Sequence, residues 1–220
     1  MKLTKKTSKT PKKKKDTPTE ETDQKDAEEL MNSILALQLE SESAEEPSKV
    51  NRMISLFGEI EEEKCGEIAF ALRYLAKNDA ENPEPIELIV STHGGGAADM
   101  FAVYDTMRLI RDDCDIITTG IGKVMSAGVL LLASGSKGKR RVGANCRIML
   151  HGVASGHVGQ IYSLENELEE VRWTQDQYIK ALAQETDMTQ RYIKKLIERK
   201  VNVYLTADEA VELGIADEVF

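Results

Sequence analysis

Apolar positions recur with two different spacings along residues 51–220, and together these spacings predict alternating strands and helices. Short apolar or β-branched runs that end at glycines or polar turns are typical of buried strands. These runs lie at 52–58, 85–92, 114–122 and 146–152. Segments with an apolar residue every three or four positions predict helices. These segments lie at 65–78, 95–113, 126–135, about 160–185, 189 to about 200, and 206–214.

Helical spacing also predicts which side chains face the core. In the helix expected over 65–78, the inward positions are Ile68, Leu72 and Leu75. In the helix expected over 95–113, they are Met100, Val103, Tyr104, Met107 and Leu109. The final helix carries its own boundary signals, because Thr206 can act as the N-cap, Glu209 as its capping-box partner and Gly214 as the stop.

The order of these elements indicates the fold class. Repeated strand–helix–strand units predict an α/β fold with a largely parallel sheet. In such folds the functional residues lie in loops at the ends of strands.

Residues 1–50 have a different composition from the rest of the chain. Almost no apolar residue occurs before Leu30, so this charged extension offers too little apolar surface to offset the entropy of ordering, and we expect it to be disordered. Its basic block at 2–15 is read as a solubilising tail rather than as a binding site for an acidic partner. A short amphipathic segment at 27–39 can either dock or stay disordered. The expected domain is therefore 51–220.

Composition excludes several classes of protein. The chain has 220 residues, of which 41% are hydrophobic, and a net charge of −9, which argues against a general nucleic-acid binder. Three widely spaced cysteines favour neither a disulfide framework nor a metal site, and they fit a reducing cytoplasm. No apolar run reaches the roughly 18 residues needed to cross a membrane. We expect a cytoplasmic protein without a membrane span, metal or cofactor.

A glycine-rich loop, STHGGGA at 91–97, follows one predicted strand and precedes a helix. The backbone N–H groups of Gly95 and Gly96 can face a cleft there without obstruction, and they are candidate donors to an anion or oxyanion. The phosphate-binding motifs G-x-x-x-x-G-K-[ST] and G-x-G-x-x-G are missing, which argues against a nucleotide site. A purely structural glycine turn is the alternative.

Ser126, at the head of a short predicted helix, is the candidate nucleophile, although a small residue is also common there for packing reasons. The G-x-S-x-G elbow motif of α/β-hydrolases is missing, because Val124 occupies the position of its first glycine. A serine hydroxyl needs a neutral imidazole to accept its proton, and His151 ends an apolar strand where it would face a site. His93 and His157 are the competing histidines.

Three segments together resemble the proteolytic subunit of the Clp protease, a family of self-compartmentalising serine peptidases. They are YDTM, SAGVLLLASGSKGKRRVGANCRIMLHG and LTADEAVELGIADEV, and the resemblance covers about 52–220. It implies that Ser126 is the nucleophile and that His151, 25 residues later, is the general base. It also implies that the oxyanion hole is made by the backbone N–H groups of Gly95 and Ala127.

Two positions depart from the family pattern. Residues 92–95 read Thr-His-Gly-Gly where the family usually has Ser-Pro-Gly-Gly, and Asn202 stands where the family has the aspartate of its triad. An amide can orient His151 but cannot stabilise the imidazolium by charge, and Asp→Asn in a serine protease triad costs about 10⁴ in turnover. The acidic residues that remain as substitutes are Glu198, Asp187 and Asp208.

The resemblance implies a Clp-like serine endopeptidase subunit of the crotonase-like α/β class, which cleaves unfolded polypeptides inside an oligomeric chamber. It further implies two stacked heptameric rings joined through a protruding handle helix that begins near Gln160. An AAA+ unfoldase would hydrolyse the ATP, since this chain has no P-loop. One alternative is a weak or inactive structural subunit, because of Asn202. Another is an acyl-CoA-binding crotonase relative, in which Ser126 and His151 coincide by chance.

Overall fold

A computed structural model describes residues 51–77, 84–199 and 201–220, so the extension predicted for 1–50, with its segment at 27–39, lies outside the described residues. The strands are β1 (Met53–Ile60), β2 (Ile86–Gly95), β3 (Ile116–Met125), β4 (Arg140–Val142), β5 (Arg147–Leu150), β6 (Val203–Leu205) and β7 (Glu218–Val219). The helices are α2 (Glu62–Lys77), α3 (Ala97–Ile110), α4 (Ala127–Ala133), α5 (Ile161–Glu185), α6 (Gln190–Ile197) and α7 (Ala207–Glu212). Every strand and helix predicted from the apolar pattern is present.

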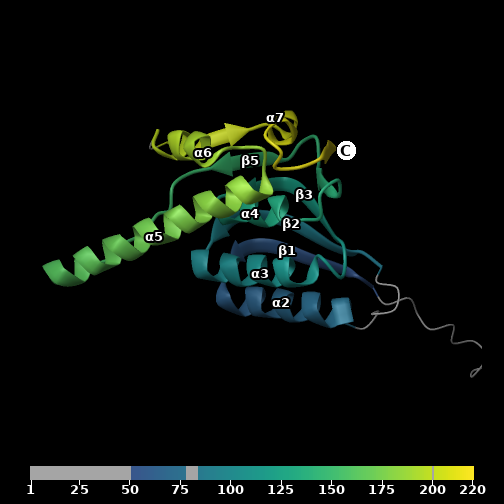
Figure 1. Ribbon diagram of the computed structural model, residues 1–220, viewed down its shortest axis with the longest axis horizontal. Coiled ribbons are helices and arrows are strands. Elements are labelled where there is room, and N and C mark those ends of the chain that lie inside the picture. The colour runs from purple at the N-terminus through teal and green to yellow at the C-terminus, as the bar shows by residue number, and fades with distance from the viewer. Residues whose placement is uncertain (1–50, 78–83, 200) are drawn as a thin grey trace, which may run out of the picture. The chain divides into compact units, whose positions relative to one another are not determined.

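The strands form one mostly parallel sheet, in which β1, β2, β3, β4 and β7 follow one another in that order (Figure 1). The long strand β3 serves two neighbours, because Thr118–Gly120 pair with β4 and Lys123–Met125 pair with β5. Only β5 and β6 pair antiparallel within the described residues. The predicted α/β fold with a largely parallel sheet is confirmed.

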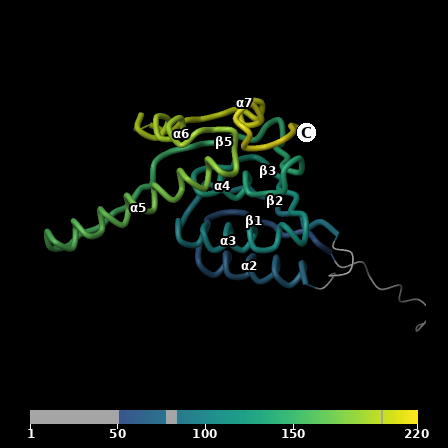
Figure 2. Tube along the Cα trace, viewed as in Figure 1, coloured from purple at the N-terminus to yellow at the C-terminus, as the bar shows by residue number. Residues whose placement is uncertain are grey.

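The helices pack against the sheet and against one another. Helix α2 contacts β1 and α3. Helix α4 contacts strands β2 and β3 and helices α3 and α5, so it lies between α3 and α5 (Figure 2). All seven residues of α4 are buried. The first turns of α5 extend beyond the sheet, where Ile161 and Tyr162 are largely exposed (Figure 1). This helix is the protruding one expected near Gln160.

Two expectations need correction. The three short strands β4, β6 and β7 were not predicted, since two or three residues are too few to show a period of two. Leu109 was expected to face inward, but it is 60% exposed and Ile110 is buried instead. Residues two positions apart on a helix do not share a face, so Leu109 cannot point the same way as the buried Met107.

The predicted boundaries of the last helix are confirmed. The Thr206 hydroxyl accepts a hydrogen bond from the Glu209 N–H at 3.2 Å, and the Glu209 carboxylate accepts one from the Thr206 N–H at 2.7 Å. Gly214 has a φ of 70°, which suits glycine after the end of a helix.

Candidate active site

Ser126 occupies a sharp turn between β3 and α4. Its φ of 55°, with a ψ of −123°, lies in the positive range that favours glycine, and it is the only residue other than glycine with a positive φ in the described part of the chain. A conformation of this kind costs on the order of 1–3 kcal/mol and is typical of functional sites. A strained strand-to-helix turn exposes the nucleophile of α/β-hydrolases. The chain therefore forms such a turn although Val124 replaces the first glycine of that motif.

Several contacts hold the turn in place. The Ser126 N–H donates to the Met149 carbonyl at 2.8 Å, and the Ser126 carbonyl accepts from the Val129 N–H at 3.0 Å. The Tyr178 hydroxyl donates to the same carbonyl at 2.9 Å. Gly94 packs directly against the serine, since a Cβ on Gly94 would lie 2.7 Å from the Ser126 Cβ. The serine is thus fixed by elements that are distant in the sequence.

A cavity of about 340 Å³ opens beside Ser126. It brings together most of the site residues expected from the sequence, and no carboxylate lies among the described residues that line it. The predicted site residues on its wall are Ser126, His151, Gly95, Gly96 and Ala127, and the wall also includes His93, Met100 and Tyr178.

The three consecutive glycines differ in what their N–H groups do. The Gly94 N–H donates to the Thr92 hydroxyl at 2.9 Å, and the Gly96 N–H donates to the Ile60 carbonyl at 2.8 Å. Ile60 on β1 is paired with Gly95 on β2. In a parallel ladder, the backbone hydrogen bonds of Ile60 go to the two residues on either side of Gly95, so the N–H of Gly95 itself points away from β1. Gly96, expected as a possible donor, lines the cavity with its N–H already occupied. Gly95 remains as the candidate donor among the three glycines, and it lines the same cavity as Ser126.

Ala127 supplies the second candidate donor. It is the first residue of α4, and the N–H groups of the first helical turn have no partner inside their own helix. Its side chain is buried while the residue lines the same cavity as Ser126.

The three histidines lie in different surroundings. His151 follows β5, is half-buried, and lines the cavity beside Ser126. His93 is exposed and lines the same cavity, whereas His157 contacts the Ser163 hydroxyl at 3.3 Å and lines another hollow. No hydrogen bond joins the Ser126 hydroxyl to either cavity histidine within the described residues. Catalytic hydrogen bonds are often long in unliganded enzymes and tighten when substrate binds.

Asn202 does not reach the first cavity. It lines a second cavity of about 410 Å³, together with His151, Gln175 and Glu198. His151 lines both cavities, the first together with Ser126 and the second together with Asn202. Asn202 and Glu198 are both exposed, and neither is hydrogen-bonded to His151 among the residues described.

The other acidic substitutes lie elsewhere. The Asp187 N–H donates to the Leu213 carbonyl, and a Cβ on Gly214 would lie 2.5 Å from the Asp187 carboxylate, so this residue, between α5 and α6, packs against the turn after α7. Asp208 is exposed in the first turn of α7. Among the three acidic candidates, Glu198 alone shares a described cavity with His151.

Two residues near the site were missed from the sequence. Tyr178, on α5, contacts the backbone of Ser126 across 52 positions of sequence. Gln175, one turn earlier, lies against Gly152, where an added Cβ would be 3.0 Å from its side-chain oxygen. In the sequence, both residues occupy positions that fit an amphipathic helix, and no local motif indicates that they belong to a site.

The cysteines do not compete as nucleophiles. Cys65, Cys114 and Cys146 are all buried and unpaired. Burial raises the pKa of Cys146 to about 11 and also raises that of Cys65, so these thiols are protonated near neutral pH. Among the described residues, no cluster of three or more His, Cys, Asp or Glu side chains is arranged to hold a metal ion.

The helices of the described segments do not include one long and apolar enough to cross a membrane. The family model described as Clp protease matches residues 46–220. This match spans most of the chain and contains the turn at Ser126, the strand that leads to His151 and the capped last helix. The chain therefore belongs to the Clp protease family.

Proposed function

We propose that this protein is a Clp-type serine endopeptidase subunit, in which Ser126 attacks the peptide carbonyl and His151 serves as the general base. The observation that carries the proposal is the strained turn at Ser126, which opens into one cavity with His151 and the glycine loop. Strain at a single non-glycine residue, supported by contacts from four elements, is typical of a residue held for chemistry.

The chemistry follows the acyl-transfer scheme. The Ser126 oxygen forms a bond to the peptide carbon while its proton passes to His151. The carbonyl oxygen becomes an oxyanion, which accepts hydrogen bonds from the Gly95 and Ala127 N–H groups. The carbon–nitrogen bond then breaks as His151 returns the proton to the leaving amine. Water, activated in the same way by His151, releases the acyl group and regenerates Ser126.

Asn202 is the third member of this arrangement. Asn202 lines a cavity with His151 that does not include Ser126, which supports a role in orienting the imidazole. An amide oxygen can accept a hydrogen bond from the imidazole but brings no charge to stabilise imidazolium. We therefore expect slower turnover than with an aspartate at this position.

Assembly and partners are part of the proposal. The substrates are unfolded polypeptides, cleaved inside two stacked heptameric rings in the cytoplasm. The exposed apolar side chains near the start of α5, among them Ile161 and Tyr162, support a role for this helix as the handle between rings. An AAA+ unfoldase would supply the work of ATP hydrolysis, since the sequence contains no P-loop.

Covalent labelling tests the chemistry directly. A small fluorophosphonate should label Ser126, and both Ser126→Ala and His151→Ala should abolish labelling while the thermal unfolding temperature stays close to that of the wild type. His157→Ala is the matched control, because that imidazole lies outside the cavity, and it should label like the wild type.

His93→Ala distinguishes the two histidines of the cavity. Labelling that depends on His93 and survives His151→Ala would transfer the role of the base to His93. Labelling that survives Ser126→Ala would overturn the assignment of the nucleophile.

A second candidate function is supported by Asn202 itself. A subunit with an uncharged third residue can serve structurally in a mixed ring with little activity of its own. Wild-type protein that resists the fluorophosphonate, but forms rings by native mass measurement, would favour this structural role.

A further inference from the structure

The Tyr178 hydroxyl contacts one peptide unit that is central to the proposed function. It donates a hydrogen bond of 2.9 Å to the Ser126 carbonyl. That carbonyl and the Ala127 N–H belong to the same peptide unit, and the N–H is one of the two proposed oxyanion donors. In a planar trans peptide, the C=O and N–H groups point in opposite directions. A partner that fixes the oxygen therefore also fixes the direction of the N–H.

We propose that Tyr178 is a positioning residue, which orients and polarises the Ser126–Ala127 peptide so that the Ala127 N–H can stabilise the oxyanion. This inference rests on the proposed function, because it concerns the same site. Among the described residues, the Tyr178 hydroxyl is hydrogen-bonded to the Ser126 carbonyl and not to the Ser126 hydroxyl or to His151, so it acts through the peptide.

The hydrogen bond suits this role in two ways. A carbonyl that accepts a hydrogen bond polarises its peptide, and linked hydrogen bonds strengthen one another by about 10–30%. The Ser126 φ of 55° is strained. The Ser126 carbonyl already accepts a hydrogen bond of 3.0 Å from the Val129 N–H, and the second one, from Tyr178, opposes relaxation of the turn. Tyr178 is 5% exposed, and burial raises the pKa of its hydroxyl, which therefore stays a neutral donor.

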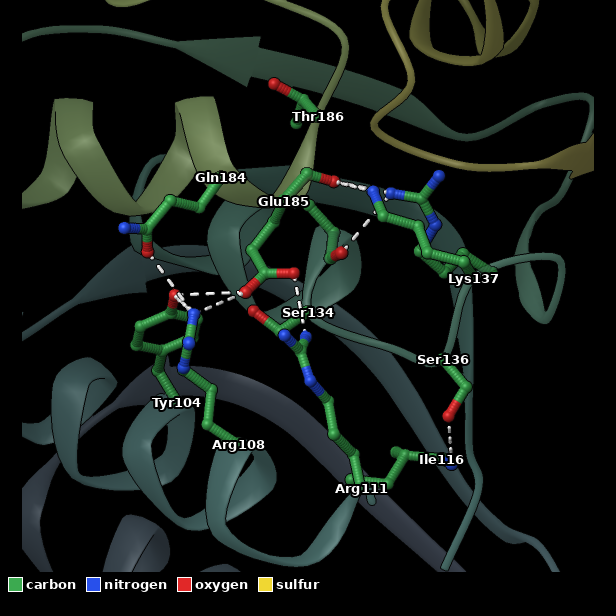
Figure 3. Close-up of polar contacts among 12 residues, drawn as sticks. Tyr104, Arg108, Arg111, Ile116, Ser134, Ser136, Lys137, Gln184, Glu185 and Thr186 are labelled. Atoms are coloured by element: carbon green, nitrogen blue, oxygen red, sulfur yellow. Dashed lines mark hydrogen bonds and ion pairs between the residues drawn. The ribbon is translucent and has the colours of Figure 1, made fainter.

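Tyr178 is itself held by a firm anchor at the end of α5. Glu185 lies seven positions later, which is about two helical turns, so the two side chains leave the helix on the same side. The Glu185 carboxylate is 1% exposed and accepts hydrogen bonds from Tyr104 at 3.0 Å, Arg108 at 3.1 Å and Arg111 at 2.8 Å (Figure 3).

The backbone at Glu185 is also fixed. Its carbonyl accepts a hydrogen bond from Arg140 at 2.7 Å. It accepts another from Lys137 (Figure 3). These contacts join the end of α5 to α3 and β4. They limit sliding of the helix, and they keep the Tyr178 hydroxyl at the distance of a hydrogen bond from Ser126.

The test is Tyr178→Phe, which removes the hydroxyl and keeps the ring. The matched control is Tyr74→Phe, which removes a tyrosine hydroxyl from α2, outside the lining of the Ser126 cavity and outside the anchor of α5. Fluorophosphonate labelling gives an inactivation rate constant and a reversible binding constant for each variant. We expect Tyr178→Phe to lower the rate constant about 10-fold, less than the 10²–10³-fold loss from deleting an oxyanion donor. The binding constant should change less than about twofold.

Two further measurements separate positioning from a general loss of structure. The pH profile of labelling should keep its midpoint in Tyr178→Phe, because the base is unaltered. Tyr178→Met, which fills the space without a hydroxyl, should also label slowly if the first variant folds poorly. Thermal unfolding of all variants identifies effects that follow stability alone.

The outcomes are distinct. Tyr178→Phe that labels as fast as the wild type, or that slows only as much as Tyr74→Phe, would overturn the positioning role. A shifted midpoint would also overturn it, since Tyr178 would then act on the base. Wild-type protein that does not label would instead overturn the proposed function and with it this inference.

Discussion

His151 and Asn202 line the same cavity but are not hydrogen-bonded to each other within the described structure. Asn202 is exposed and directly precedes β6, and His151 is half-buried and directly follows β5. Strands β5 and β6 pair antiparallel, so this sheet edge brings the two positions near each other although they are 51 residues apart. The pairing supports the proposal that Asn202 orients His151.

Replacing Asn202 with aspartate should therefore increase activity. A carboxylate stabilises the imidazolium that forms when His151 accepts the serine proton, and the reverse change costs about 10⁴ in a serine protease. We expect Asn202→Asp to raise the hydrolysis of a fluorogenic peptide by about 10-fold or more. Asn202→Ala is the control without an orienting oxygen and should be slower than the wild type. A neutral result for Asn202→Asp would mean that another residue already orients His151.

Glu198 is the residue that such a result would implicate, since it lines the same cavity. It is exposed, and a solvated carboxylate contributes little to a neighbouring charge because water and salt screen it. We therefore expect Glu198→Gln to change the rate of fluorophosphonate labelling by less than about twofold. A loss of about 10-fold would identify Glu198 as the acid that assists His151. Asp208→Asn, with an exposed carboxylate outside this cavity, is the matched control.

Gly94 tests how closely the glycine loop supports the nucleophile. A methyl group there would lie 2.7 Å from the Ser126 Cβ and 3.2 Å from the Met125 carbonyl oxygen, and the φ of +108° is strained for alanine. We expect Gly94→Ala to displace Ser126 and to slow labelling about 100-fold, as a displacement of about 1 Å does in other active sites. Labelling at the wild-type rate would show that the loop is not needed to hold the serine.

Gly66→Ala is the control substitution of the same kind. Gly66 lies inside α2, is exposed, and has no atom within 4 Å of an added Cβ. Alanine favours the helix over glycine, so this variant should be more stable by about 0.5–1 kcal/mol in urea unfolding, with labelling unchanged.

The sequence predicts those parts of the site that lie at the ends of regular elements. His151 ends an apolar strand and Ser126 begins a buried helix, and both positions line one cavity. The resemblance to the Clp protease family, in which these two residues took part, is confirmed for the chain as a whole by the family match. Local periodicity also predicts the buried face of α2 correctly.

The remaining features depend on pairings between distant segments. The Gly96 N–H is occupied because β2 lies beside β1 and places it against Ile60. The strained φ of Ser126 is imposed by contacts with Met149 and Tyr178, on β5 and α5. No window of sequence contains both partners of any of these contacts, so periodicity and local motifs cannot reveal them.

Arg140, which is buried, and Asp217, which is half-buried, form an ion pair that joins β4 to the segment before β7. The Asp217 carboxylate accepts hydrogen bonds from the Arg140 N–H and Nε, both at 2.9 Å, and from a terminal nitrogen of the same guanidinium. Burial opposes ionisation of Asp217, but these hydrogen bonds outweigh it and hold the pKa of the carboxyl below its ordinary value of 3.8. The ion pair therefore stabilises the fold above about pH 4, and its contribution is lost as the pH falls through the folded pKa.

Asp217→Asn should expose this contribution. The Arg140 side chain is 4% exposed, so loss of its only carboxylate partner among the described residues leaves a buried charge and should cost about 3 kcal/mol at pH 7. Because the wild-type carboxyl becomes protonated in acid, the difference in unfolding free energy between wild type and variant should shrink as the pH falls from 5 to about 2. Urea unfolding at a series of pH values measures this difference.

The matched control is Asp115→Asn. The pKa of the Asp115 carboxyl is also lowered, chiefly by its hydrogen bond with Lys139. That pair is 46% and 40% exposed, so the variant should lose at most about 1 kcal/mol. A constant difference between wild type and Asp217→Asn across this pH range would show that the ion pair does not couple folding to the ionisation of Asp217.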